Sequence, residues 1–289
     1  MDRRVIQVVT GHQQREGGGF VVRRPFPSRG IPNFDPFLML DELGPVDYAP
    51  GEAMGAPDHP HRGFETVSYI LEGEVAHADS AGHSGFLHAG DVQWMTAGAG
   101  VVHREMPSLH MQKEGGPMHG FQLWVNLPRA LKRSPPRYQE LRADRIPEAT
   151  TADGLASVRV IAGSALGVQA PTRTHTPIQY HHWRLRAGAT LSLSYPSDQR
   201  IGIYVFRGQA QLCGTALKAG QLGVLGEGEK FLIEANENTE FLLLGGTPLR
   251  EPVAWSGPFV MNTEAELHEA YADFRAGRMG AIPPEIVRA

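Results

Sequence analysis

Short β-strand-like runs separated by glycine turns recur along most of the chain, and they restrict the fold more than any other feature. Runs such as FETVSYILEG, GFQLWVNLP, IGIYVFRG and TEFLLLGG are rich in β-branched, aliphatic and aromatic residues. Such runs at short spacing are typical of β-sandwiches and β-barrels. We therefore expect an all-β protein.

Two parts of the chain resemble each other. VSYILEGEVAHAD in the first half is similar to IGIYVFRGQAQLC in the second half, with Gly73 opposite Gly208. LHAGDVQWM is likewise similar to LKAGQLGVL, with Gly90 opposite Gly220. Each segment indicates strands joined by tight glycine turns, and self-similarity of this kind predicts a repeated structural unit. We therefore predict two similar jelly-roll-like β-barrels in one chain.

Domain boundaries follow from the composition along the chain. We place an N-terminal barrel at residues 1–130, an interdomain linker rich in proline and charge at 131–150, and a C-terminal barrel at 151–289. A short helix is predicted near the end, in NTEAELHEAYADFRAG. Thr263 and Glu266 have the spacing of a capping box, and Gly277 can end the helix.

The overall composition limits the classes of partner. The formal net charge is −4, so no broad basic surface is expected, and we predict neither direct nucleic-acid binding nor membrane binding. Cys213 is the only cysteine, which excludes a disulfide framework and a cysteine-based metal site. The N-terminal residues lack the apolar segment of a secretory signal, and we expect a cytoplasmic protein.

A metal site is predicted from two pairs of residues with the same spacing. His59 and His61 occur in DHPHRGFETVSYILEG, and His103 and Glu105 occur in AGAGVVHREMP. Side chains at i and i+2 of a strand point to the same face, so the two pairs can converge on one cation. Three imidazoles and one carboxylate suit Fe(II), Mn, Ni, Cu or Zn. Glu65 is a rival carboxylate that could instead form an ion pair with a nearby arginine.

The other histidines are expected to lie outside this site. His77, His83 and His88 surround a glycine-rich turn, so we expect them to be solvated. His119 alternates with apolar residues in GFQLWVNLP and its flank, so we expect it to be buried.

Several longer motifs resemble those of a known family. HPHRGFETVSYILEGEVAHAD, AGDVQWMTAGAGVVHREMP, GFQLWVNLP, PPRYQEL and EPVAWSGPFVMNT are similar to signatures of the pirin family of the cupin superfamily. The resemblance implies a bicupin with a metal, usually iron, in its N-terminal barrel. It also implies the ligands His59, His61, His103 and Glu105, and so favours Glu105 over Glu65 as the carboxylate ligand.

The second half departs from this ligand pattern. When the turn glycines are aligned, Ser194 and Pro196 fall opposite the first histidine pair, and Ile233 and Ala235 fall opposite the second pair. We therefore predict one divalent metal per chain and a C-terminal barrel without metal ligands.

The resemblance also implies a function. Some pirins are similar to flavonol dioxygenases that open quercetin with O2 and release carbon monoxide, which implies a flavonol-like aromatic substrate. Glu105 or Glu65 could then be the catalytic base. Phe64, Trp94, Met95 and Phe121 would suit the pocket wall, but they would equally suit a core.

Two other functions stay open. A non-enzymatic, iron-dependent regulator would bind a transcription factor or a metabolic enzyme. A sugar-phosphate isomerase would need a basic cluster to hold phosphate, and only Arg62 and Arg104 lie near the predicted ligands.

Overall fold

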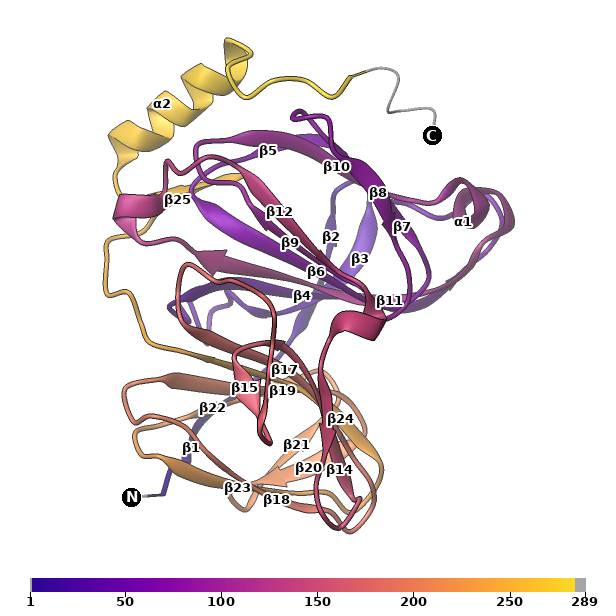
Figure 1. Cartoon of the computed structure of the whole chain (residues 1–289), viewed down its shortest axis with the longest axis vertical. Coiled ribbons are helices and arrows are strands. Elements are labelled where there is room, and N and C mark those ends of the chain that lie inside the picture. Colours follow the sequence, from indigo (N-terminus) through magenta and orange to yellow (C-terminus); the bar gives the residue numbers. More distant parts are fainter. Residues whose placement is uncertain (1, 284–289) are drawn as a thin grey trace. The chain divides into compact units, whose positions relative to one another are not determined.

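A computed structural model describes residues 2–283, and nearly all of its regular structure is β-strand (Figure 1). The chain forms two compact units, each assembled from separate segments. Unit 1 contains residues 2–12, Pro25–Pro36 and Asp144–Leu249, whereas unit 2 contains Gln13–Arg24, Phe37–Ala143 and 250–283. The domain boundaries predicted from the sequence remain a prediction. Residues 143 and 144 are one of several places at which the chain passes from one compact unit to the other.

Unit 2 consists of a seven-stranded and a four-stranded antiparallel sheet. The larger sheet has the order β12 (Arg137–Leu141), β9 (Val92–Thr96), β6 (Phe64–Glu72), β11 (Gly116–Asn126), β4 (Phe37–Tyr48), β3 (Phe20–Phe26) and β2 (His12–Glu16). The smaller sheet has the order β5 (Ala56–His61), β10 (Val101–Pro107), β7 (Val75–Asp79) and β8 (Ser84–Leu87).

Unit 1 repeats this arrangement strand for strand. Its larger sheet has the order β1 (Val5–Thr10), β22 (Gln221–Leu225), β19 (Arg200–Arg207), β24 (Thr239–Gly246), β17 (Ile178–Leu185), β14 (Ala156–Ala162) and β13 (Glu148–Thr150). Its smaller sheet has the order β18 (Thr190–Ser194), β23 (Lys230–Glu234), β20 (Gln209–Leu212) and β21 (Thr215–Lys218). The predicted repeat is therefore confirmed, although each unit is a two-sheet sandwich and its sheets are not a closed barrel.

Glycine is required at the turns that the repeat identified. Gly73 follows β6 with a φ of +91°, and Gly208 follows β19 with a φ of +73°. This backbone region is disfavoured for residues with a Cβ. A Cβ would also lie 2.6 Å from the Pro117 carbonyl oxygen at Gly73, and 2.4 Å from that of Asn238 at Gly208. These turns can therefore form only with glycine.

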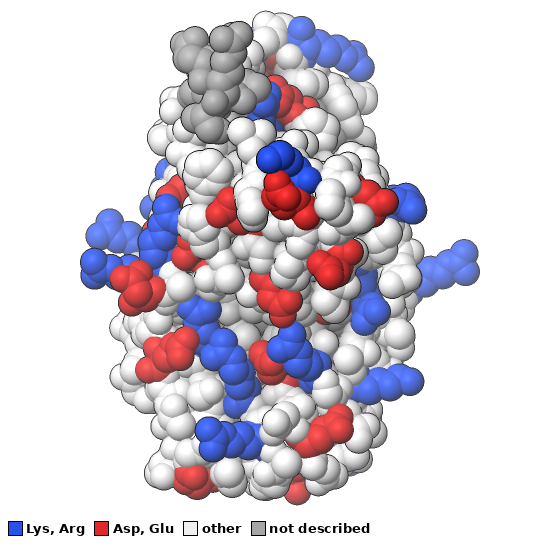
Figure 2. Space-filling view, turned by 90° about the vertical axis from the view of Figure 1, so that its right-hand side faces the viewer, with Lys and Arg blue, Asp and Glu red and all other residues white. Residues whose placement is uncertain are grey.

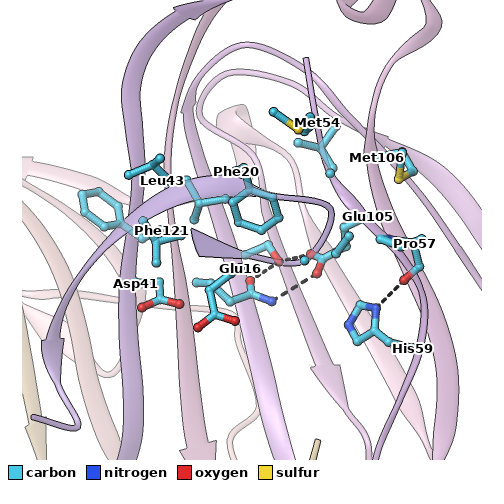
Figure 3. Close-up of a pocket in the computed structure, with 18 of the residues that line it drawn as sticks. Glu16, Phe20, Asp41, Leu43, Met54, Pro57, His59, Glu105, Met106 and Phe121 are labelled. Atoms are coloured by element: carbon cyan, nitrogen blue, oxygen red, sulfur yellow. Dashed lines mark hydrogen bonds between the residues drawn. The ribbon is translucent and has the colours of Figure 1, made fainter. Parts of the chain in front are cut away.

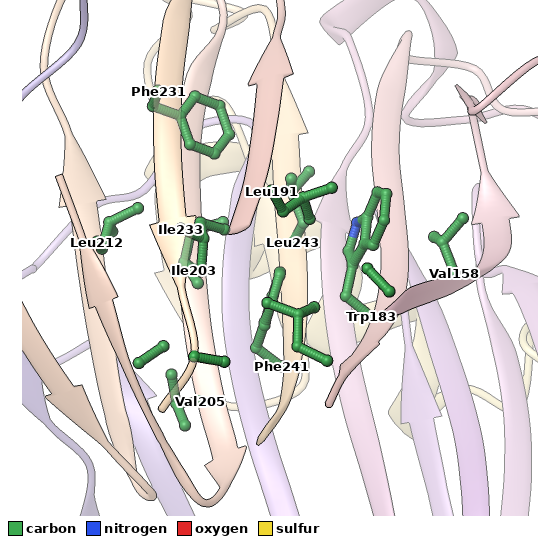
Figure 4. Packing of buried hydrophobic residues seen from close by; sticks show 14 of the residues in the cluster. Val158, Trp183, Leu191, Ile203, Val205, Leu212, Phe231, Ile233, Phe241 and Leu243 are labelled. Atoms are coloured by element: carbon green, nitrogen blue, oxygen red, sulfur yellow. The ribbon is translucent and has the colours of Figure 1, made fainter. Parts of the chain in front are cut away.

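The interior of unit 1 is a continuous apolar core (Figure 4). Trp183, Phe241 and Leu243 are fully buried there with aliphatic residues from both sheets. Leu191 of β18 pairs with Ile233 of β23, and both side chains belong to this core. Ile233, which the glycine alignment placed at the position of His103, therefore packs in an apolar core.

Short elements complete the two units. In unit 2 they are α1 (Leu109–Glu114), a 3₁₀ turn at Arg129–Leu131, β25 (Ala254–Ser256), β26 (Phe259–Met261) and α2 (Glu264–Arg275). The hairpin of β15 (Ser164–Ala165) and β16 (Val168–Gln169) belongs to unit 1, and a second 3₁₀ turn spans Ala143–Arg145.

The predicted C-terminal helix is confirmed as α2. Thr263 is its N-cap and forms a capping box with Glu266. Across the helices of residues 2–283, none combines the length and apolar character needed to span a membrane. Acidic and basic side chains are interspersed over the face shown in Figure 2.

Candidate metal centre

Three histidines meet on the smaller sheet of unit 2. β5 and β10 are antiparallel neighbours, and their pairing places His59 directly opposite His103. The ring centroids of His59 and His61 are 4.7 Å apart, those of His59 and His103 are 4.3 Å apart, and those of His61 and His103 are 4.9 Å apart. One potential ligand atom from each histidine lies within 4.8 Å of the other two.

Hydrogen bonds fix the tautomer of two of these rings. His59 Nδ1 lies 2.7 Å from the Pro57 carbonyl oxygen, and His61 Nδ1 lies 3.2 Å from that of Pro258. Because a carbonyl only accepts, each Nδ1 carries a proton, so Nε2 is the nitrogen that has the lone pair in the neutral ring. This is the arrangement in which a histidine binds a metal through Nε2.

His103 is buried in a way that a metal would explain. It is almost completely inaccessible, and neither of its ring nitrogens has a hydrogen-bond partner within the part of the chain that the structure describes. Burial, reinforced by the neighbouring His59, holds the pKa of both His61 and His103 well below the ordinary histidine value. These two imidazoles are therefore neutral at neutral pH, as metal ligands must be. The three histidines fit a divalent cation.

Glu105 lines the same cavity as His59 and His61 but is outside the group of three histidines, and it is held by two polar side chains. Ser68 Oγ is 2.6 Å from Glu105 Oε1, and Gln122 Nε2 donates to Glu105 Oε2 at 3.2 Å. Ser68 and Gln122 are cross-strand neighbours on β6 and β11. The β5–β10 register shifts between His103 and Glu105, so Glu105 is paired with Ala56 and not with Pro57.

A cavity of about 600 Å³ opens onto His59, His61 and Glu105 (Figure 3). Its wall is mainly apolar and includes Phe20, Leu43, Met54, Met106 and Phe121. Ser68 and Gln122 also line it, which the sequence analysis missed. No clear signal for them was present in the sequence, because both strands contain other polar residues, such as Thr66 in β6 and His119 in β11.

A charged group forms another part of the cavity wall. Arg24 donates to both carboxylate oxygens of Asp41, at 2.7 and 2.6 Å, and also lies 2.8 Å from Glu16. Glu16, Arg24 and Asp41 all line the cavity. This guanidinium is therefore already shared by two carboxylates.

Glu65 lies away from the cavity. It is fully buried, its Oε1 accepts a hydrogen bond from Thr96 at 2.7 Å, and burial raises its pKa. It is neither in the histidine group nor among the cavity-lining residues. Of the four apolar residues suggested as pocket walls, only Phe121 lines the cavity, whereas Phe64, Trp94 and Met95 are buried in the core.

The remaining histidines differ in part from expectation. His119 is buried, as predicted, and lies 3.0 Å from Glu42. His83 and His88 are exposed, also as predicted. The prediction for His77 was wrong, because this residue is buried, with its Nε2 2.9 Å from Glu140. His77 lies on β7 opposite Glu105 of β10. The glycine-rich turn near His77 in the sequence did not indicate this strand pairing.

Sequence and structure comparisons identify the family. Residues 19–125 match Pirin, and residues 180–280 match the Pirin C-terminal cupin domain. The chain belongs to the pirin family. Both units are therefore cupin-type domains, and the family predicted from the sequence motifs is confirmed.

Three relatives illustrate this membership. Mouse pirin is 42% identical over 96% of this chain and 94% of its own length. A tomato pirin-like protein is 41% identical over 96% of this chain and 93% of its own length. The crystal structure of quercetin 2,3-dioxygenase from Acinetobacter baumannii superposes with a TM-score of 0.93 at 38% identity, over 98% of this chain and 100% of that protein.

Proposed function

We propose that this protein is a metal-dependent dioxygenase that opens flavonols such as quercetin with O2 and releases carbon monoxide. The observation that carries the proposal is one mainly apolar cavity bordered by two of the three clustered histidines and by Glu105. The likeness to a quercetin 2,3-dioxygenase supports the same chemistry. Cavities of about 300–1,000 Å³ hold ligands of the size of a flavonol.

His59, His61 and His103 would hold one divalent metal, for which the family resemblance favours Fe(II) over Mn, Ni, Cu or Zn. When bound, the metal would supply Lewis acidity that lowers the pKa of a substrate hydroxyl. Glu105 is the proposed fourth ligand, and it is also the proposed base. It lies on the cavity wall, whereas Glu65 does not, so the structure supports Glu105 over Glu65 for the second role.

The contacts around Glu105 suit a group that accepts a proton. Ser68 Oγ lies 2.6 Å from both Glu105 Oε1 and Gln122 Oε1, and Gln122 Nε2 lies 3.2 Å from Glu105 Oε2. A serine hydroxyl has only one hydrogen, so an ionised Glu105 leaves one of the three contacts without a proton. A proton on Glu105 Oε1 completes the ring, since Glu105 then donates to Ser68, Ser68 to Gln122, and Gln122 to Glu105.

The charges near the cavity support a neutral hydroxylated substrate over a phosphorylated one. Each nearby guanidinium already has an acidic partner, because Arg24 binds Asp41, Arg62 lies 2.7 Å from Asp273, and Arg104 lies 2.6 Å from Asp58. A phosphate would have to displace these carboxylates. We therefore do not propose a sugar-phosphate isomerase.

Oxygen uptake with quercetin tests the proposal. The chain is reconstituted anaerobically with Fe(II), mixed with aerated quercetin, and compared with His61→Ala and with the control variant His88→Ala, whose side chain is exposed. We expect O2 uptake and carbon monoxide release by the wild type and His88→Ala, and neither by His61→Ala. One bound iron per chain without O2 uptake would contradict the dioxygenase and favour the alternative, an iron-dependent regulator of a transcription factor or metabolic enzyme.

A further inference from the structure

The segment from β25 to α2 lies against the loop that follows His61, although almost 200 residues separate them in the sequence. Val260 N donates to the Arg62 carbonyl oxygen at 3.1 Å, and Arg62 forms a parallel bridge with Phe259. Gly63 has a φ of +89°, and a Cβ there would lie 2.0 Å from the Val260 carbonyl oxygen. We name residues 254–275 the C-terminal strap.

The strap contacts a proposed metal ligand directly. The Pro258 carbonyl oxygen accepts the hydrogen bond from His61 Nδ1 at 3.2 Å. This bond sets both the ring orientation and the tautomer that leaves Nε2 available for a metal. Trp124 packs edge-on against the same ring, with centroids 5.1 Å apart, and Trp255 of the strap is tilted against Trp124 at 5.6 Å.

An ion pair between buried Arg62 and half-buried Asp273 fixes the strap next to this ligand. Arg62 is almost inaccessible, its Nη2 lies 2.7 Å from Asp273 Oδ2, and its Nε donates to the Ala99 carbonyl oxygen at 2.6 Å. Asp273 belongs to α2, so the helix is held to the residue that directly follows His61.

A buried lysine provides a second connection. Lys132 Nζ donates to the Gly63 carbonyl oxygen at 2.8 Å and to the Val260 carbonyl oxygen at 3.0 Å. Lys132 therefore joins the loop after His61, through Gly63, to the strap, through Val260. Arg62 and Lys132 thus both hold the strap, which contains Pro258, against the residues that directly follow His61.

We propose that the C-terminal strap positions His61 for metal binding, and that Asp273 is a positioning residue of the metal centre. This inference rests on the proposed metal site. Loss of a partner that orients a metal-binding histidine typically weakens metal affinity about 10–100-fold. Asp273 acts through Arg62 and Pro258, so we expect the lower part of that range.

Co(II) titration of the metal-free chain tests the proposal, because the visible absorption bands of bound Co(II) report its ligand geometry. Asp273→Asn is compared with Glu269→Gln on the same helix, whose carboxylate pairs with the exposed Arg133 at 2.7 and 2.6 Å. We expect Asp273→Asn to weaken Co(II) affinity about tenfold and to shift the bands. Glu269→Gln should keep the Co(II) affinity within twofold of the wild type and leave the absorption bands unshifted.

The possible outcomes separate this inference from the metal site itself. If the wild type binds one Co(II) and Asp273→Asn matches it in affinity and spectrum, the positioning role is wrong. If the wild type binds no Co(II), the metal site itself is wrong. Should Asp273→Asn not fold, the double variant Arg62→Met/Asp273→Leu avoids an unpaired buried charge. It is expected to show the same weakened affinity, and unchanged affinity would overturn the proposal.

Discussion

His59 lies directly opposite His103 on the antiparallel strands β5 and β10, with 4.3 Å between their ring centroids. His103 is buried, and neither of its ring nitrogens has a hydrogen-bond partner among residues 2–283, so it stabilises the folded state poorly when no metal is present. The site therefore favours metal binding over the stability of the metal-free chain.

Replacing His103 with leucine tests this conflict between stability and binding. The two ring nitrogens lose their hydration on folding and gain no partner, at about 1–3 kcal/mol for each unsatisfied group. We expect metal-free His103→Leu to be about 1–2 kcal/mol more stable than the metal-free wild type in urea unfolding. The variant should also lose metal-induced stabilisation. A leucine variant that is less stable than the metal-free wild type would contradict this account.

The two roles proposed for Glu105 are separated by Glu105→Gln. A general base contributes about 10²–10⁴-fold to a rate, so loss of this role should reduce quercetin turnover by at least about a hundredfold while iron content stays at one per chain. If Glu105 is mainly a ligand, iron content or affinity falls together with turnover. Measuring both quantities on the same samples decides between these roles, and unchanged turnover would exclude the base.

We expect the free energy of unfolding to depend on pH because of the buried Lys132. Burial lowers the pKa of Lys132 from 10.5 to about 8. The folded chain therefore binds fewer protons than the unfolded chain between these values, and stability rises as pH increases from about 8 to about 10.5. The lowering of the Lys132 pKa corresponds to a rise of about 3 kcal/mol in the free energy of unfolding across this pH range.

The matched comparison for Lys132 is Lys132→Met. This change leaves the carbonyl oxygens of Gly63 and Val260 and the Asn126 side chain without their donor, and we expect a loss of about 3 kcal/mol near pH 7. Urea unfolding of both metal-free proteins at several pH values gives the contribution of Lys132 by difference. Parallel pH profiles of the two proteins would show that Lys132 stays protonated in the folded state throughout this range.

We expect Arg24 to stabilise the folded protein through its ion pair with Asp41 in the cavity wall. Asp41 is almost inaccessible and is bound by Arg24 through two hydrogen bonds, so Arg24→Met leaves a buried carboxylate without its cation. Breaking such a pair costs about 3–5 kcal/mol. Arg24→Met/Asp41→Asn should recover a large part of this loss. A double variant that is no more stable than Arg24→Met would show that Asp41 is not the cause.

The sequence predicted the parts of the site that depend on strand periodicity. His59 and His61 share a face because they are two residues apart, and the structure brings His103 to the same place. The repeat was visible because turn glycines such as Gly73 and Gly208 have no substitute at positive φ. These features are local, so short stretches of sequence contain them.

The remaining features depend on contacts between distant segments. The Pro258–His61 bond joins positions 197 residues apart, and Ser68, Gln122 and Glu105 come from three strands. His77 was expected in solvent because the sequence around it resembles a turn, but β7 is paired with β10 and buries it. No local periodicity specifies which strands become neighbours.

The number of metal ions that His59, His61 and His103 hold tests the proposed metal centre. Metal-free chain is titrated anaerobically with Fe(II) and its bound iron is counted, alongside His59→Ala, His61→Ala and the control His88→Ala. We expect one iron per chain in the wild type and His88→Ala, and a large loss of affinity in the other two variants. Equal iron binding by all four proteins would contradict the proposed metal centre.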